Sequence, residues 1–130
     1  MALHYDIDAG AGCVRIAGAG PLSMTEMVAM VDTVAEDARF RPHYGVIFSL
    51  LNATYAADLP DGDIFADALK RRQKDFQGPF ALVVPPGLHV LAQLFCVMAR
   101  TGGFDRMRCF LDAAEAEDWC THWKPTAAER

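Results

Sequence analysis

The chain has 130 residues and a mass of 14.2 kDa, the size of one folded domain, and we expect a single domain over residues 1–130. With 52% hydrophobic and 22% charged residues, the composition excludes a disordered chain and a fibrous repeat. The formal net charge of -5 disfavours binding to the phosphates of nucleic acids and to anionic membrane surfaces.

The distribution of cysteine and histidine predicts neither a metal nor a cofactor. The four cysteines are far apart, none belongs to a Cys-x-x-Cys pair, and the histidines are isolated from them and from one another. Gly18–Ser23 imitates part of a dinucleotide-binding loop but lacks its third glycine, so a plain turn is expected. Met1–Asp6 lacks the basic and apolar segments of a secretory signal, which predicts a cytoplasmic protein.

One long uncharged segment, from Phe76 to Ala99, resembles a membrane span in length. The Pro85–Gly87 triplet interrupts it, because proline lacks a backbone donor and breaks regular structure. The helical piece that remains is too short to cross a bilayer. We therefore predict a buried strand followed by a buried helix, without stable insertion into a membrane.

The first half of the chain begins with two short strands. Alternating apolar residues over Tyr5–Ile16, with a Gly-rich turn between them, predict a hairpin that ends at Gly18–Pro21. Ser23 and Glu26 then form the sequence pattern of a capping box, and apolar residues at helical spacing follow it. This is the best-specified helix of the chain.

The second half alternates strands and helices. The nearly continuous apolar run Val46–Leu51 is typical of an interior parallel strand, and Asn52–Gly62 is predicted to be a loop. Asp112 and Glu115 form a second capping-box pattern before a final helix that Pro125 closes. The elements expected between that loop and the final helix are a helix over Asp63–Phe76, a strand over Phe80–Val84, a helix over Gly87–Thr101 and a strand over Arg106–Leu111. The side chains expected to face inward from the first of these helices are Ile64, Ala68, Leu69 and Phe76.

This order of elements predicts an α/β fold. It consists of an open mixed sheet with an N-terminal hairpin followed by sequential right-handed β-α units. If consecutive strands lie side by side, every helix falls on the same face, so the helices are expected mainly on one face of the sheet. Such a strand order has no reversal point, which is where open α/β sheets usually hold cofactors.

Three stretches of the chain resemble the SpoIIAA-like proteins, a family that shares its fold with STAS domains and the lipid-binding Sec14 domains. They are Ala38–Pro42, His89–Phe95 and Cys109–Trp119, the last of which combines a strand-end Phe with an acidic, Ala-containing helix start and a Trp. The resemblance covers most of the chain and implies a SpoIIAA-like, or STAS-like, fold from a bacterial branch of the family. None of the three stretches is an enzyme signature.

The chain also departs from this family in places that bear on function. STAS regulators that antagonise anti-sigma factors are switched by phosphorylation of a Ser at the start of the second helix. The corresponding segment here, Ala56–Gly62, has no hydroxyl group, so no such switch is expected. Ser49 and Leu51 stand where relatives often carry Asp and Arg, and Gln93 replaces a helical Arg.

The helix predicted over Gly87–Thr101 has the most informative pattern. At about 100° per residue its core face is predicted to consist of Leu88, Leu91, Leu94, Phe95 and Met98. A narrow polar stripe, formed by His89, Gln93, Cys96 and Arg100, runs along the helix at i, i+4, i+7 and i+11.

Two functional interpretations follow from this helix. His89, Gln93 and Arg100 are candidate ligands for an anionic or amphipathic molecule. Val90 and Val97 stand beyond the polar stripe and are candidates for an interface that seals a dimer or a lipid pocket. The alternative in both cases is an ordinary solvent-exposed face with two apolar residues on it.

The sequence thus favours a non-catalytic interaction or regulatory module that binds a protein partner or a second copy of itself, as in a homodimer. It contains no recognisable pair of nucleophile and base, and the exposed valines need an explanation. The alternative is a module that binds a small apolar molecule or lipid, as the relationship to Sec14 domains implies. An enzyme with a reactive cysteine or histidine ranks third.

Overall fold

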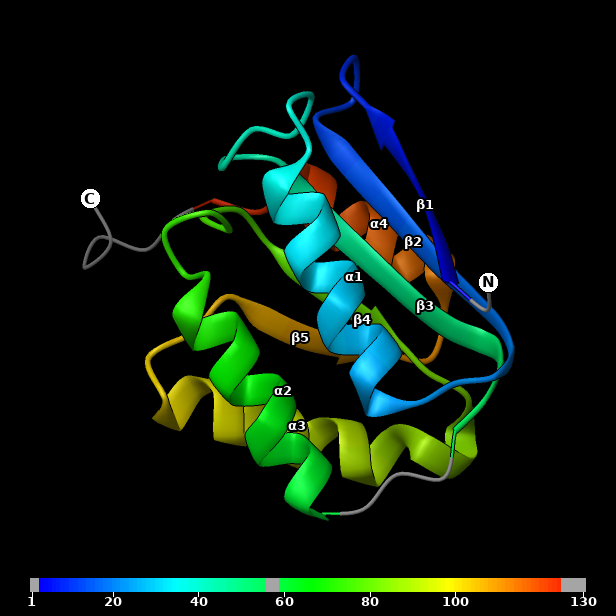
Figure 1. Cartoon of the computed structure of the whole chain (residues 1–130). Helices are drawn as coiled ribbons and strands as arrows, with labels where there is room; N and C mark the ends of the chain where they lie inside the picture. Colours follow the sequence, from blue (N-terminus) through cyan, green and yellow to red (C-terminus); the bar gives the residue numbers. More distant parts are fainter. Residues whose placement is uncertain (1–2, 56–58, 125–130) are drawn as a thin grey trace.

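The computed structural model describes residues 3–55 and 59–124, which form one five-stranded sheet flanked by helices (Figure 1). The sheet follows the chain order β1-β2-β3-β4-β5, with β1 antiparallel to β2 and the other neighbours parallel. The strands are β1 (Leu3–Asp8), β2 (Cys13–Pro21), β3 (Gly45–Thr54), β4 (Phe80–Val83) and β5 (Met107–Phe110). The predicted hairpin followed by sequential β-α units is confirmed.

The helices occupy both faces of the sheet, but unequally. In the described residues they are α1 (Met24–Glu36), α2 (Leu59–Arg71), α3 (His89–Thr101) and α4 (Ala113–His122), with a short 3-10 turn, η1 (Pro86–Leu88), before α3. Figure 1 shows α1, α2 and α3 on one face and α4 on the other. The expectation that the helices lie mainly on one face is confirmed, whereas the stricter expectation of every helix on that face is wrong for α4.

The connectivity explains why α4 differs from the other helices. Each of α1, α2 and α3 joins two neighbouring parallel strands, so the handedness of the crossover assigns them to one face. No described strand follows α4, so this constraint does not act on it. The far face of the sheet carries apolar side chains that α4 covers with Ala116, Trp119 and Cys120. The side chains that it covers include Ile47, Ala81, Val83 and Phe110.

The main core lies between the sheet and the three crossover helices. Its centre is aromatic, with Phe80 of β4 in ring contact with Phe48, Phe65, Phe76 and Phe104. Burial of such large side chains supplies most of the hydrophobic free energy of a small domain.

Local signals in the sequence account for the helix starts. At α1, the Glu26 amide donates to Ser23 Oγ at 3.2 Å and the Ser23 amide donates to Glu26 Oε1 at 3.2 Å, which completes the predicted capping box. At α4, Asp112 accepts from the amide of Ala114 at 2.7 Å rather than from that of Glu115. Asp112 therefore caps α4, as expected, but the predicted capping box with Glu115 does not form.

The second helix differs from its prediction in both bounds and phase. It spans Leu59–Arg71 instead of 63–76. The helix can begin earlier because a proline is well tolerated in a first helical turn. It ends earlier because the chain turns after Arg71, where the Asp75 amide donates to the Arg72 carbonyl at 2.8 Å. Phe76 is buried, as predicted, but it reaches the core from this turn. Ile64, predicted to face inward, is 50% exposed, and its neighbour Phe65 fills the core instead.

Two further boundaries differ from the prediction. The strand expected to end at Leu51 continues to Thr54, and the hairpin strand continues through Pro21, with a register shift between Ala17 and Ala19. Pro125, expected to close the final helix, and residues 56–58 of the segment compared with the phosphorylated loop lie outside the described residues. In the described part of the chain, no helix combines the length and apolar character that a bilayer crossing requires.

Candidate functional site

The core face of α3 is confirmed in large part: Phe95 is buried, and Leu88, Leu91 and Met98 are partly buried against the core, as expected. Its buried side chains are Ala92, Phe95, Cys96 and Ala99. Leu94, expected in the core, is 42% exposed. Helix α2 explains this, because Gly62 lies so close to Phe95 and Met98 that a Cβ added there would come within 2.8 Å of the Phe95 ring. Helix α2 therefore covers Phe95 and Met98 and leaves Leu94 outside.

The polar residues predicted on α3 line one groove. His89, Gln93 and Arg100 share it with Cys96 and Val97 of the same helix. The opposite wall is β5, which contributes Met107, Arg108 and Cys109. The groove has a volume of about 410 Å³, within the range of roughly 300–1,000 Å³ that is typical of ligand sites. We call this the α3–β5 groove.

Arg100 is the charged side chain that faces the α3–β5 groove from α3, and neither it nor Arg108 forms an ion pair with a carboxylate among the described residues. No acidic residue is among the described lining of this groove. Arg108 borders the groove at the edge of the sheet, but it pairs with Ala81 and its side chain lies on the α4 side of β5. There it lines another groove with Glu115 and Asp118. The guanidinium of Arg108 lies 5.2 Å from the centre of the Phe110 ring. By contrast, the arginines paired with carboxylates are Arg15, Arg39, Arg71, Arg72 and Arg106.

The thiols in the α3–β5 groove are poor nucleophiles. Burial raises the pKa of Cys96 to about 12, with a further contribution from the neighbouring Cys109. Burial also raises the pKa of Cys109. Both thiols therefore stay protonated at neutral pH, and the thiolate is the reactive form of cysteine. Sequence reasoning placed Cys96 in the polar stripe and did not connect it with Cys109.

An exposed apolar stripe lies beside the groove on α3. Val90 is 71% exposed and Val97 is 52% exposed, as their interface assignment requires. Leu94 falls between them, so that the three residues stand at i, i+4 and i+7 on one side of the helix. We call Val90, Leu94 and Val97 the α3 stripe. The expected valine pair is thus a continuous row of three side chains.

The cavity among the described core residues offers little space for an apolar ligand. This cavity, of about 20 Å³, lies where β3 and β4 end, lined by apolar side chains of the sheet, α1 and α3. Its rim includes Tyr55, whose hydroxyl donates to Asp61 Oδ2 at 2.8 Å. A single buried water needs roughly 10–15 Å³ by this measure. The cavity therefore has room for about one water molecule and none for an acyl chain.

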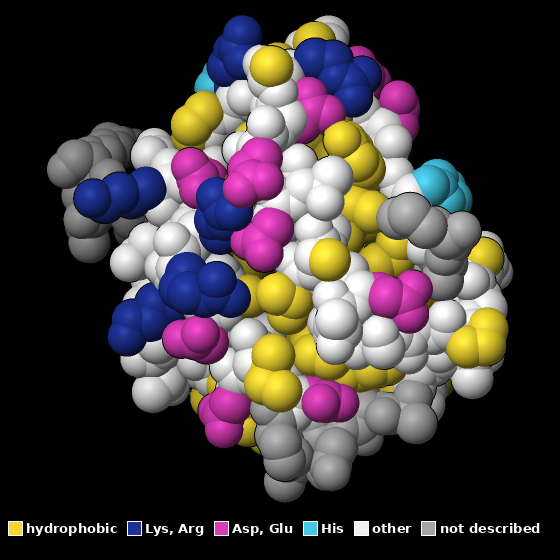
Figure 2. All heavy atoms as spheres, viewed as in Figure 1, with side chains coloured by type: hydrophobic (Ala, Val, Ile, Leu, Met, Phe, Trp, Pro, Cys, Tyr) yellow, Lys and Arg dark blue, Asp and Glu magenta, His cyan; other side chains and the backbone are white. Residues whose placement is uncertain are grey.

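The surface over α1, α2 and α3 has mixed charge. Figure 2 shows acidic and basic side chains interspersed there with exposed apolar ones. Such a face lacks the broad basic surface by which proteins bind nucleic acids. Among residues 3–55 and 59–124, no three His, Cys, Asp or Glu side chains are grouped so that they could hold a metal ion.

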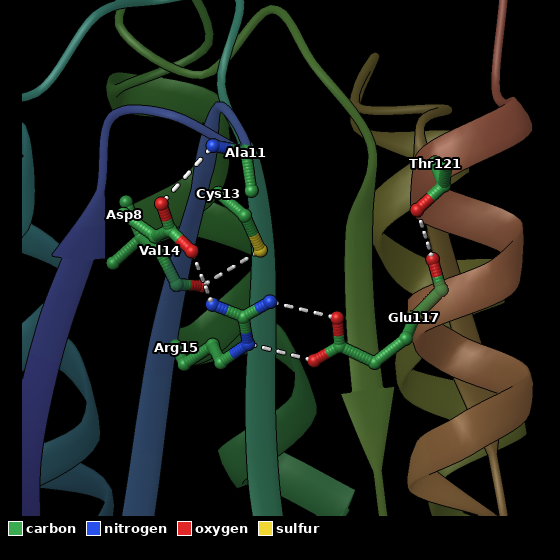
Figure 3. A network of polar contacts seen from close by, with 7 residues as sticks. All are labelled: Asp8, Ala11, Cys13, Val14, Arg15, Glu117 and Thr121. Carbon is green, nitrogen blue, oxygen red and sulfur yellow. Dashed lines mark hydrogen bonds and ion pairs between the residues drawn. The ribbon is translucent and has the colours of Figure 1, made fainter.

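On the far face, an ion-pair network fastens α4 to the sheet (Figure 3). Arg15 donates to both carboxylate oxygens of Glu117, from Nε at 2.7 Å and from Nη2 at 2.9 Å. Its Nη1 donates to Asp8 Oδ2 at 3.3 Å. The hydrogen bonds from Arg15 hold the pKa of Glu117 below its usual range. This two-pronged geometry connects β1, β2 and α4 at a single guanidinium.

Replacing Glu117 with glutamine should lower the free energy of unfolding by up to about 1 kcal/mol at pH 7, because both partners are about 40% exposed and water screens the pair. Folding lowers the pKa of Glu117. The ion pair therefore stabilises the folded protein fully at a pH above the pKa that Glu117 has in the unfolded chain, and this stabilisation is lost as the pH falls through the pKa of Glu117 in the folded protein. Urea unfolding of both proteins between about pH 7 and pH 3 measures this, and a difference that stays constant as the carboxylate protonates contradicts it.

Comparison with solved structures gives an informative likeness. Neither a protein-family model nor a curated protein matches the sequence. Among solved structures, it resembles an uncharacterized protein of the DUF3478 family with a SpoIIAA-like fold from Shewanella loihica. The two chains are 14% identical, and their TM-score is 0.58 over 91% of this chain and 93% of the other. Likeness at this level of identity concerns the fold, and with the sheet order it establishes that the chain has a SpoIIAA-like fold.

Proposed function

We propose that the chain is a non-catalytic, STAS-like interaction module that docks through the α3 stripe, first of all with a second copy of itself. The observation that carries this proposal is the alignment of three exposed aliphatic side chains on one helix. Apolar surface contributes roughly 25 cal/mol per Å² when it is removed from water, and contiguous apolar patches are typical of interaction sites. A two-fold symmetric dimer, the commonest oligomer, would place the two stripes against each other.

The state of the cysteines supports a role without catalysis. Burial raises the pKa of Cys120 to about 12, and it raises the pKa of Cys13 as well. Together with the two groove cysteines, all four thiols therefore lack the lowered pKa of a catalytic cysteine. The segment Ala56–Gly62 has no hydroxyl group, which supports a module without a serine switch at that position.

The small volume of the internal cavity favours docking over the alternative of an apolar ligand. A lipid chain needs far more than the cavity of about 20 Å³ at the ends of β3 and β4. Native mass spectrometry of freshly purified protein separates the two functions. We expect a mass equal to the polypeptide or its dimer, and a co-purified lipid or fatty acid would favour the alternative.

Size-exclusion chromatography with light scattering tests the α3 stripe directly. At high protein concentration we expect a mass above 14.2 kDa for the unmodified chain, and a monomer for Val90→Asp and for Val97→Asp. A charge placed on an apolar contact loses its hydration when the contact forms, so each substitution should weaken self-association by at least about tenfold.

Leu111→Asp is the matched control for these variants. Leu111 is also exposed and apolar, but it lies after β5 and outside the α3 stripe. We expect this variant to associate as the unmodified chain does. A strict monomer at high concentration that neither valine substitution changes would contradict the proposed self-association.

A further inference from the structure

We propose that the free edge of β1 binds an extended segment of a partner protein in which aliphatic and basic residues alternate. The segment would add to the sheet as a further strand, with its aliphatic side chains against α1 and its basic side chains beside the carboxylates of β1. This surface consists of β1 and α1, whereas the α3 stripe lies on the helix that packs beside β5, at the other end of the sheet. The inference therefore goes beyond the proposed self-association and does not depend on it.

The first argument is that β1 is an edge strand. It stands first in the order of the sheet, and among the described residues its neighbouring strand is β2 alone (Figure 1). It has six residues, against four in β5 at the opposite edge. Exposed edges are the sites at which extended peptides add to a sheet, with main-chain hydrogen bonds supplying affinity and side-chain contacts supplying specificity. β1 therefore offers the longer of the two edges for such an addition.

A groove between β1 and α1 lies on one side of this edge. It has a volume of about 470 Å³, and Figure 2 shows apolar side chains exposed between the two elements. Its lining consists of Leu3, His4 and Tyr5 of β1 with Glu26, Ala29, Met30 and Thr33 of α1. Successive residues of a strand point to opposite faces, so every second side chain of an added strand would enter the groove. The largely apolar lining suits aliphatic side chains at these positions.

The opposite face of β1 is acidic. Alternation along the strand places His4, Asp6 and Asp8 on this face. Arg15 of β2 stands opposite Asp6, but its guanidinium donates to Asp8 and to Glu117. Asp6 is exposed and forms no ion pair with a cation among the described residues. Three carboxylates thus share one guanidinium on this face.

These carboxylates select the chemistry of the segment. Opposite charges in directly facing positions of two strands attract, and like charges repel. A Lys or Arg facing Asp6 would therefore stabilise the added strand, whereas an acidic residue there would destabilise it. A second copy of β1 would bring its own Asp6 and Asp8 to this face, which disfavours pairing of β1 with itself. The net charge of -5 further favours the approach of a basic segment.

Fluorescence anisotropy with a labelled peptide of ten alternating Lys and Val residues tests the inference. We expect saturable binding at low ionic strength that weakens as salt is added, because salt screens the contacts between ammonium and carboxylate groups. The same peptide with Asp in place of Lys should not bind. Binding of the Lys peptide should also slow hydrogen exchange at every second amide of β1, since the amides that face away from β2 gain a strand partner.

Substitutions on the two faces of the edge separate strand addition from general attraction between charges. Asp6→Asn should weaken binding of the Lys peptide roughly threefold, as the loss of one exposed ion pair predicts. Asp63→Asn is the matched control, because it removes the same charge from an exposed position on α2, and it should leave the affinity unchanged. Ala29→Gln places a larger, polar side chain in the groove without changing the net charge. We expect it to weaken binding at least about threefold.

A second peptide tests the requirement for alternation. Five Lys residues followed by five Val residues have the composition and charge of the first peptide, but they cannot place aliphatic side chains on one face of a strand and basic ones on the other. We expect this block peptide to bind at least about tenfold more weakly than the alternating one.

The inference would be overturned by the absence of saturable binding at low salt, by equal binding of the Asp peptide, or by equal losses for Asp6→Asn and Asp63→Asn. Full affinity of the block peptide or of the Ala29→Gln variant, or unchanged hydrogen exchange in β1, would overturn it as well. The Val90→Asp and Val97→Asp variants should bind the alternating peptide as the unmodified chain does, whatever their state of association. Failure at the edge of β1 is thereby distinguishable from failure of the proposed docking through the α3 stripe.

Discussion

Replacement of Phe80 with alanine should lower the free energy of unfolding by about 3–5 kcal/mol. The side chain is 1% exposed and stands at the centre of the aromatic core. Its ring centre lies 6.0–6.4 Å from those of four other phenylalanines, which are Phe48, Phe65, Phe76 and Phe104. These rings come from β3, α2 and two connecting segments, so the cavity left by the truncation cannot be filled by the movement of one element.

Urea unfolding followed by circular dichroism measures this loss. A domain of this size has a total stability of about 5–15 kcal/mol, so the variant should unfold at a much lower urea concentration. Leu111→Ala is the control, because Leu111 is exposed and lies outside the α3 stripe, and surface substitutions usually change stability by less than about 0.5 kcal/mol. A loss below about 1 kcal/mol for Phe80→Ala would show that the aromatic centre of the core is wrongly described.

A single methyl group added at Gly78 should be nearly as damaging, with an expected loss of at least about 2 kcal/mol. A Cβ at this buried position would lie 2.6 Å from the carbonyl oxygen of His43 and still closer to that of Tyr44. Both atoms belong to the backbone, so no side-chain rotation relieves the clash. The amide of Gly78 also donates to the Pro42 carbonyl at 3.1 Å, which holds the two segments together.

Gly87→Ala provides a matched comparison for Gly78→Ala. A Cβ at Gly87 would meet no atom within 4 Å, and the backbone there does not require a positive φ. We therefore expect a stability equal to that of the unmodified chain or higher by up to about 1 kcal/mol, since alanine restricts the unfolded state. Thermal unfolding of both variants measures the contrast. Equal melting temperatures would contradict the close approach at Gly78.

Local patterns in the sequence predict most of the elements. The capping box at Ser23 forms as its spacing indicates, and the apolar run Val46–Leu51 lies inside an interior strand. The Pro-Pro-Gly triplet at 85–87 separates β4 from α3, as proline and glycine predict. Such features are predictable because each depends on hydrogen bonds and backbone conformations within a few residues of the chain.

The exposure of individual helix residues depends on neighbours that are distant in the sequence. Ile64 and Leu94 were expected in the core from helical spacing, yet both are exposed, because the mutual packing of α2 and α3 selects which of several apolar faces is covered. A pattern of period 3.6 identifies the apolar positions of a helix without giving its rotation against a particular neighbour.

The candidate site shows the same division. His89, Gln93 and Arg100 follow from the spacing of one helix, and they do line one groove, whereas Met107 and Cys109 join them from β5 across a connection. The sequence alone establishes the elements, the order of alternation and the polar stripe, all of which depend on local contacts. Three other features arise from packing between separate elements, which a one-dimensional pattern does not encode. They are the position of β5 beside the polar stripe, the row that Leu94 forms with Val90 and Val97, and the place of α4 on the far face.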